Sequence, residues 1–266
     1  QRMKEKEVGG ITIGTDLESS KMAVDLAEKH ENIWACIGMH PIQKTPSATG
    51  TSPLSRGSKT DAEIRGIPPL DQGGGWVGLE FEKLVQSPKV VGIGECGLDY
   101  FHIKDESDKK RQKDLFKQQI EFALKHDKPL MLHCREAYDE VLEILEKYKG
   151  NNLRGNCHFF AGSPEQAKKF MELNFSCSFT GVITFPPAPG GRAGTHDYDE
   201  TIKFLPQEFI MSETDSPFVA PVPYRGKRNE PVYVVEVVKK IAEIRGEDVE
   251  FTRSYLVKNA KRIFGL

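Results

Sequence analysis

Residues 89–95 read KVVGIGE, and the chain continues as CGLDYFH to residue 102. The first seven residues are nearly all apolar, which predicts a strand covered on both faces, as in a parallel sheet. Further short runs of this kind alternate with longer amphipathic runs along the chain, which is typical of βα units. The other predicted strands are residues 11–14, 33–38, 129–133, 153–159, 175–179 and 209–213.

The amphipathic runs predict helices whose apolar residues recur at helical spacing. The first helix has Asp16 or Ser19 as its candidate N-cap. The predicted helices are residues 19–30, 109–126, 137–149, 164–173, 231–245 and 248–264.

The chain has 266 residues, close to the roughly 250 of a single (β/α)8 barrel. Such a barrel needs eight parallel strands, and seven are predicted. Residues 1–10 are charged and resemble the tail of a helix. We therefore predict an α/β fold of the TIM-barrel type whose first strand is missing, with the chain beginning inside the first βα unit.

Two segments interrupt the alternation, and both are rich in Pro and Gly. They are residues 46–75 and 186–196. The βα pattern resumes in phase after each, so we interpret them as flexible insertions on the rim of one domain, residues 1–266.

Composition limits the classes of function. Hydrophobic residues make up 38% of the chain, with neither a membrane-length apolar run nor a signal-peptide stretch, which predicts a soluble, cytoplasmic protein. The net charge of −2 argues against a passive DNA-coating protein, but not against an enzyme that meets phosphate through bound metals. The five cysteines lack a C-x-x-C pair, and we interpret them as core residues of a reducing compartment.

Polar residues gather where the predicted strands end, and in βα barrels this end carries the functional residues. Each one alone would more often be a structural hydrogen-bonding or turn residue, but their joint occurrence on one face favours a metal site. These residues are His40 in GMHP, Glu95 and Asp99 in GECGLD, His133 and Arg135 in HCRE, His158 in CHFF, and Glu213 and Asp215 in SETDSP.

The residue types indicate the chemistry. Imidazole and carboxylate ligands suit zinc, and carboxylate oxygens also suit magnesium or manganese. A bound ion makes hydroxide available at neutral pH, and a pair of ions can clamp a phosphodiester. Asp215 would then orient the attacking water, bind the metal, or do both. Arg135 would either clamp a phosphate oxygen or be a solvated rim charge.

Several segments together resemble the TatD family of metal-dependent deoxyribonucleases. They are VVGIGECGLDYFH (90–102), LHCREAYDEVLEIL (132–145), the run from Asn156 to Phe185, ETDSPFVAPVPYRGKRNEPVYV (213–234), NAKRIFGL (259–266) and GMHPIQ (38–43). The resemblance covers nearly all of the chain outside the two insertions. It implies a TIM barrel of the metal-dependent hydrolase superfamily that cleaves DNA, often as a 3′→5′ exonuclease on single strands, and often as a monomer.

The resemblance also implies roles for individual residues. Glu95 resembles the carboxylate that bridges two ions, and His133 and His158 resemble the two histidines that hold one of them. Asp215 resembles the aspartate that is both ligand and catalytic residue. The implied cofactors are one or two divalent ions of magnesium, manganese or zinc.

Three further residues are predicted to bind substrate. His40 resembles a histidine near the substrate phosphate, and Arg135 follows His133 by two residues. Arg225, with its neighbours Lys227 and Asn229, would either contact the nucleic-acid backbone or brace the last loop.

One feature of the family is missing, because the chain contains no H-x-H motif. In the family, those histidines hold the second ion together with Glu95 and Asp215. Here the site would keep one ion and bind a second one weakly. The alternatives are a hydrolase of another ester or amide, a non-catalytic homologue that binds at most one metal, and an incomplete gene model.

Overall fold

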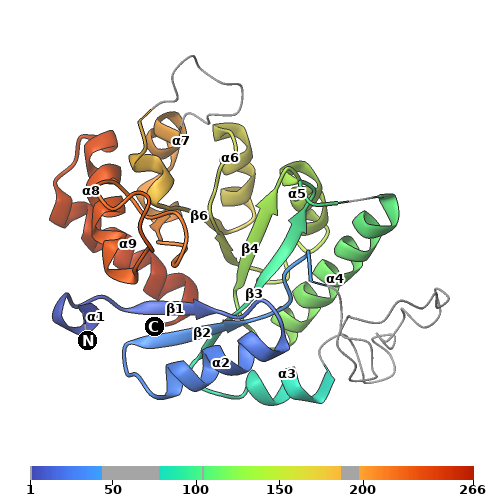
Figure 1. Cartoon of the computed structure of the whole chain (residues 1–266). Coiled ribbons are helices and arrows are strands. Elements are labelled where there is room, and N and C mark those ends of the chain that lie inside the picture. Colours follow the sequence, from blue (N-terminus) through green and yellow to red (C-terminus); the bar gives the residue numbers. More distant parts are fainter. Residues whose placement is uncertain (1, 44–77, 104, 187–197) are drawn as a thin grey trace.

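The computed structural model describes residues 2–43, 78–103, 105–186 and 198–266. Within these ranges seven strands form one parallel sheet in chain order. The sheet is curled, and the helices lie around its outer side (Figure 1). The strands are β1 Gly10–Ile13, β2 Ile33–Ile37, β3 Val90–Asp99, β4 Leu130–Arg135, β5 Gly155–Cys157, β6 Phe175–Phe179 and β7 Ile210–Ser212. The predicted α/β barrel-like fold and all seven predicted strands are confirmed.

Strand β3 is longer than predicted, because it continues past Glu95 to Asp99. Its register against β4 shifts between Ile93 and Cys96. Gly97 has φ 138°, which a residue with a side chain rarely adopts, and a Cβ there would collide with the carbonyl oxygen of His133. The glycines of this segment therefore let β3 continue in close contact with β4, and the site residues of both strands lie side by side.

The six predicted helices are confirmed with shifts of a few residues at their ends. Helix α2 has Asp16 as its N-cap, and Asp16 and Ser19 bond each other's backbone in a capping box. Such a cap contributes about 0.5–2 kcal/mol to helix stability.

The helices of the described residues are α1 Arg2–Glu5, α2 Leu17–Glu28, α3 Gly78–Leu84, α4 Glu106–Lys125, α5 Tyr138–Glu146, α6 Pro164–Glu172, α7 Tyr198–Phe204, α8 Val234–Arg245 and α9 Val249–Phe264. Short 3-10 turns lie at Gly181–Thr184, Gln207–Phe209 and Pro231–Tyr233.

The sequence prediction missed two helices, α3 and α7. Each has seven residues, which is too short for a helical period to stand out. Each also follows one of the two predicted insertions. Residues 46–75 lie outside the described residues, and residues 186–196 do so except for Pro186.

The two faces of the sheet have separate cores. The outer face packs against the helices in one large apolar cluster that includes Ile93, Leu132 and Phe179. The inner face has a smaller apolar cluster. It contains Cys36, Val91, Met131 and Met211, with Ile263 and Phe264 from the end of α9, and Ile11, Ile13, Trp34, Ala260 and Leu266 packed against it. We call this group the inner apolar cluster.

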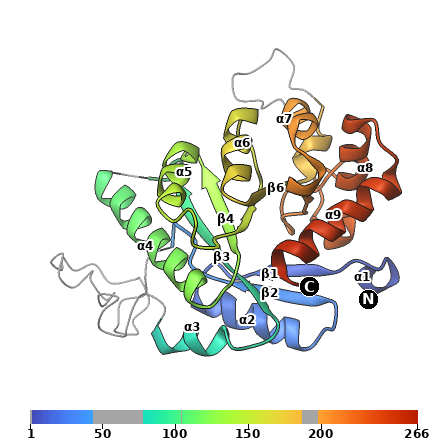
Figure 2. The same cartoon turned by 180° about the vertical axis from the view of Figure 1, so that it is seen from behind.

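The end of α9 lies next to β1 in both views of the molecule (Figures 1 and 2). Phe264 is 5% exposed, and it packs in the same cluster as Ile11 and Ile13 of β1 and Met211 of β7. The C-terminal helix therefore closes the inner face between the two outer strands of the sheet.

All five cysteines are buried and free, as predicted for core residues. No helix in the described ranges combines the length and the apolar character that crossing a membrane requires.

Candidate metal centre

The predicted site residues converge at the carboxyl ends of the strands. Glu95 lies within β3 and His133 within β4, while His158 follows β5 directly. Asp215 comes three residues after β7, and His40 three residues after β2. Their side chains come from five strands that lie far apart in the sequence, and the curl of the parallel sheet brings them to one place.

His40, Glu95 and His133 form the tightest group. One ligand atom from each lies within 4.8 Å of the other two, which is close enough to hold a metal ion. His133 Nδ1 is 2.7 Å and His40 Nε2 is 3.5 Å from Glu95 Oε1. The His40 and His133 rings meet edge to face, with centroids 4.2 Å apart. His40, predicted as a phosphate-binding residue, thus lies among the candidate ligands.

His158 and Asp215 complete the predicted set. His158 Nε2 lies 3.9 Å from Glu95 Oε1 and 3.8 Å from Asp215 Oδ1. Both distances are too long for a hydrogen bond. Metal–nitrogen and metal–oxygen bonds of about 2.0–2.2 Å would bridge such gaps with little movement. The spacing and the nitrogen and oxygen donors fit a divalent cation.

Backbone hydrogen bonds hold these side chains in position. The amide of Glu95 donates to Gly14 O at 3.1 Å, and the amide of His40 donates to Thr15 O at 2.9 Å. The amide of His158 donates to Leu132 O at 2.9 Å. Gly14 and Thr15, directly after β1, therefore support the site through their backbone carbonyl groups.

The charges at the site depend on one another. Burial would raise the pKa of the Glu95 carboxyl, but hydrogen bonds from His133 and His40 hold that pKa well below its ordinary 4.5. Burial disfavours the charged form of His133, yet hydrogen bonds to Asp99 and Glu95 raise its pKa above 6.5. A carboxylate at Glu95 is therefore available as an anionic ligand across the neutral range.

Asp215 and His158 also have shifted pKa values. Burial raises the pKa of Asp215 to about 6, and the nearby Glu213 and Glu95 carboxylates add to the shift while His158 opposes it. Burial would lower the pKa of His158, but the charges of Glu213, Glu95 and Asp215 raise it to about 10. A cation placed among these groups would displace the imidazole proton, since ligands bind metals in their deprotonated form.

Three polar residues around this group were given no role by the sequence analysis, although Asp99 and Glu213 were among the residues noted at the strand ends. Asp99 Oδ2 lies 3.1 Å from His133 Nε2 and 2.9 Å from His102 Nδ1. Glu213 Oε1 lies 2.7 Å from His158 Nδ1. Asp99 and Glu213 stand at strand ends in the sequence, so the signal was available, but pattern alone does not show which histidine a carboxylate contacts.

The two predicted substrate-binding arginines lie over aromatic rings. The Arg135 guanidinium is 3.9 Å from the centre of the Phe101 ring, and that of Arg225 is 4.2 Å from the centre of the Phe185 ring. Both arginines are exposed, and Phe101 is 53% exposed. Both therefore have their charge accessible to solvent, and their rotation is limited by stacking.

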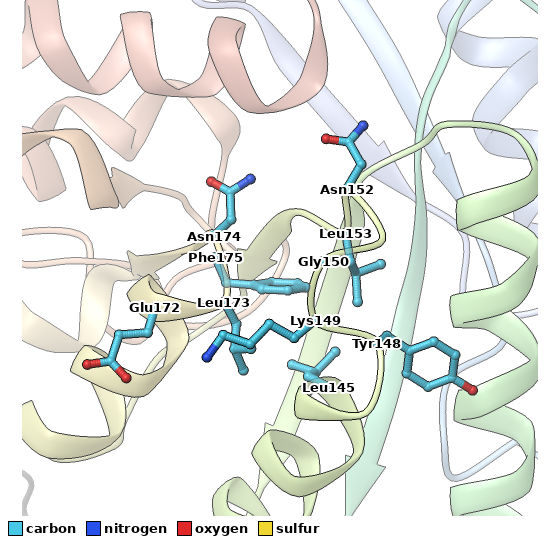
Figure 3. A pocket seen from close by; sticks show the side chains of 10 residues that line it. All are labelled: Leu145, Tyr148, Lys149, Gly150, Asn152, Leu153, Glu172, Leu173, Asn174 and Phe175. Carbon is cyan, nitrogen blue, oxygen red and sulfur yellow. The ribbon is translucent and has the colours of Figure 1, made fainter.

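A separate pocket lies at the opposite end of the strands (Figure 3). It is lined by the turn after α5, the end of α6 and the start of β6, including Lys149, Glu172 and Phe175. It encloses about 190 Å³. Pockets that bury a small molecule have volumes of about 300–1,000 Å³, so this pocket is not a competing candidate for the functional site.

Comparison with known proteins gives a consistent result. The chain matches the TatD related DNase family over residues 1–265. It is 34% identical over 265 residues to an uncharacterized metal-dependent hydrolase of Bacillus subtilis strain 168, YabD, covering 99% of this chain and 90% of the relative. It is 28% identical over 272 residues to the 3′-5′ ssDNA/RNA exonuclease TatD of Erwinia amylovora, covering 100% of this chain and 92% of the relative.

A solved structure agrees with the sequence relatives. The TatD homolog YjjV of Escherichia coli K12 has a TM-score of 0.78 and 25% identity, covering 100% of this chain and 90% of that one. The matches to the family and to YabD extend over nearly the whole chain, including the segments that carry the site. This chain belongs to the TatD related DNase family, and it is a metal-dependent hydrolase of that family.

Proposed function

We propose that this protein hydrolyses phosphodiester bonds in single-stranded nucleic acid, releasing nucleotides from the 3′ end with the help of one or two divalent cations. The observation that carries the proposal is the convergence of His40, Glu95 and His133, whose ligand atoms lie within 4.8 Å of one another. The relative from Erwinia amylovora, a 3′-5′ ssDNA/RNA exonuclease by name, supports the substrate class.

Glu95, His133, His158 and Asp215, together with His40 beside Glu95, are the residues that would hold the cation. Their nitrogen and oxygen donors suit zinc, manganese or magnesium. When bound, the cation would lower the pKa of a water molecule, so that hydroxide is available at neutral pH, and it would polarise the phosphate. Asp215 orients the attacking water at Oδ1 and accepts its proton.

Exposed cationic and aromatic groups near the site suit a nucleic-acid strand. The guanidinium group of Arg135 can bond two phosphate oxygens at once, and Arg225 offers the same chemistry from the loop after β7. Phe101 exposes half of its surface beside Arg135, and exposed aromatic rings stack on unpaired bases. His40 either binds the same cation or contacts the substrate phosphate, and the geometry favours the first role because of its distance to Glu95.

The test is nucleotide release from a single-stranded DNA oligonucleotide labelled at its 5′ end, in manganese or magnesium, with and without a chelator. Glu95→Ala is assayed in parallel, because the whole cluster is built around this carboxylate. Glu136→Gln is the matched control, since Glu136 is an exposed carboxylate three residues after His133.

We expect shortening of the strand from its 3′ end, lost on chelation and in Glu95→Ala, and unchanged in Glu136→Gln. Folded protein that releases no more nucleotide than Glu95→Ala in excess metal would overturn the proposal. Activity that survives both the chelator and the Glu95 substitution would overturn the assignment of the site.

A further inference from the structure

We propose that Asn229 is a positioning residue: its buried side-chain amide fixes the turn that carries Asp215, and so it sets the rate of hydrolysis rather than the affinity for substrate. The inference rests on the proposed function, in which Asp215 orients the attacking water. It also separates Asn229 from Arg225 of the same loop, because Arg225 is exposed, whereas Asn229 is 2% exposed.

Asp215 lies in a tight turn, residues 214–218, which we call the Asp215 turn. Its φ of 55° is in the left-handed region, which residues other than glycine adopt at a cost. The amide of Phe218 donates to Asp215 O at 2.8 Å and closes the turn. A left-handed residue persists where the surrounding contacts determine its conformation. The contacts that hold this turn therefore also fix the direction of the Asp215 side chain.

Asn229 supplies these contacts from the far end of the loop. Its Nδ2 donates to Thr214 O at 2.7 Å, on the residue before Asp215, and to Phe218 O at 2.6 Å, at the last residue of the turn. Its backbone amide donates to Pro217 O at 3.1 Å. One side-chain amide thus joins both ends of the Asp215 turn.

The side chain of Asn229 is fixed in its turn by its other contacts. Its Oδ1 accepts the amide of Glu230 at 2.8 Å, so its carbonyl oxygen and both of its N–H groups are used. An aspartate has the same shape but no donor, and it would place a carboxylate against two carbonyl oxygens. The turn therefore requires the amide, and not only a side chain of this size.

A matched control lies at the other end of β7. Asn259 is 3% exposed, and its Nδ2 donates to Gln207 O and to Ile210 O. These carbonyl groups lie before and at the start of β7, whereas the Asp215 turn follows its end. Asn229→Ala and Asn259→Ala therefore each remove two hydrogen bonds from a buried amide to the backbone, but they do so at opposite ends of the strand.

The first experiment compares kcat and KM for nucleotide release from single-stranded DNA in manganese, together with urea unfolding of each variant. In Asn229→Ala we expect kcat lower by about 10- to 100-fold at unchanged KM, since a displacement of about 1 Å at a reacting group can cost a factor of about 100. Asn259→Ala should lower the urea midpoint to a similar extent and keep kcat within about twofold of wild type. An equal loss of kcat in both variants would overturn the inference.

The second experiment follows amide hydrogen exchange by NMR in the metal-free protein, and it needs no activity. In wild type we expect slow exchange of the Phe218 amide and of the Asn229 side-chain amide, because both are hydrogen-bonded within the turn. In Asn229→Ala the Phe218 amide should exchange at least about tenfold faster. The Glu213 amide, which donates to Phe179 O, should keep its wild-type rate. Asn259→Ala should leave the Phe218 amide protected.

The outcomes separate the inference from the proposed function beneath it. Wild-type protein without metal-dependent nucleotide release would overturn the proposed function and, with it, the effect of Asn229 on turnover. Active wild type would overturn the inference alone if Asn229→Ala kept its kcat, or if the Phe218 amide exchanged at the same rate in both proteins. Fast exchange of the Asn229 side-chain amide in wild type would do the same, and that measurement requires no variant.

Discussion

The two ends of the inner face of the sheet have opposite character, although the same strands form both. On β4, Met131 belongs to the inner apolar cluster, and His133, two residues later, belongs to the metal centre. On β7, Met211 packs in that cluster, and Glu213, two residues later, contacts His158.

The difference shows how one strand serves stability and chemistry at once. Side chains two residues apart point to the same face of a strand and lie about 7 Å apart along it. The side chain two residues further along the strand therefore lies in the metal centre, while the side chain before it lies in the inner apolar cluster. We expect substitutions at the first end to change stability alone, and substitutions at the second end to change ion binding.

The largest expected effect is a loss of stability on substitution in the inner apolar cluster. Phe264→Ala removes a buried ring that closes the inner face, and it should lower the free energy of unfolding by about 3–5 kcal/mol. Urea unfolding followed by circular dichroism measures the loss. Phe251→Ala is the control on the same helix, because Phe251 is 51% exposed and should lose far less. Similar losses in both variants would show that a ring in the inner apolar cluster stabilises the fold no more than an exposed ring does.

The next effect concerns the polar end. A ligand at 100 times its Kd stabilises the folded state by about 2.7 kcal/mol. Wild type and Phe264→Ala should both gain this amount when Zn²⁺ is added, while Glu95→Gln should gain almost nothing. Unfolding midpoints with and without the ion check this. A gain in Glu95→Gln equal to that of wild type would place the ion elsewhere.

Gly97→Ala should lower both the stability of the fold and the affinity for Zn²⁺. The new methyl group would collide with the carbonyl oxygen of His133, and φ of 138° is strained for alanine. We expect a loss of about 1–3 kcal/mol in unfolding free energy and weaker Zn²⁺ binding, because β4 must shift at its ligand. Gly150→Ala is the control, since its φ is also positive but a Cβ there meets no atom within 4 Å. Zn²⁺ affinity unchanged in Gly97→Ala would show that the ligand tolerates this shift.

The smallest effect is the pH dependence of the metal-free protein. Contacts with His133 and His102 overcome burial and lower the pKa of Asp99 below its ordinary 3.8, so the stability that it contributes is present above that pH and lost as pH falls through the lower value. The pKa of His133 is raised, so its contribution is full below pH 6.5 and lost as pH rises through the higher value. The contributions of these two residues are therefore both present in full between pH 3.8 and pH 6.5.

Urea unfolding in the presence of a chelator, from pH 3 to pH 9, measures this profile. Asp99→Asn should flatten its acid side, and Phe264→Ala should keep the shape at lower overall stability. An acid side of equal slope in wild type and Asp99→Asn would show that Asp99 contributes nothing to it.

The sequence was informative where local rules dominate. Apolar runs such as residues 89–95 predicted the strands, because a strand covered on both faces has few polar residues. The ligands Glu95, His133 and His158 could be proposed because parallel strands present their carboxyl ends on one side. Helices α3 and α7 were missed because seven residues hold too little periodicity, and β3 ran past Glu95 because its glycines allow close contact with β4.

The sequence alone thus determined three things: the order of strands and helices, the end of the sheet that carries the site, and the family. All three depend on periodicity and on motifs that are local in the chain. The tertiary structure decided which atoms meet. It placed His40 beside Glu95, Asp99 behind His133 and Glu213 behind His158, and it packed the end of α9 between β1 and β7. These contacts join residues distant in sequence, and they depend on the curl and register of the whole sheet, which no local pattern encodes.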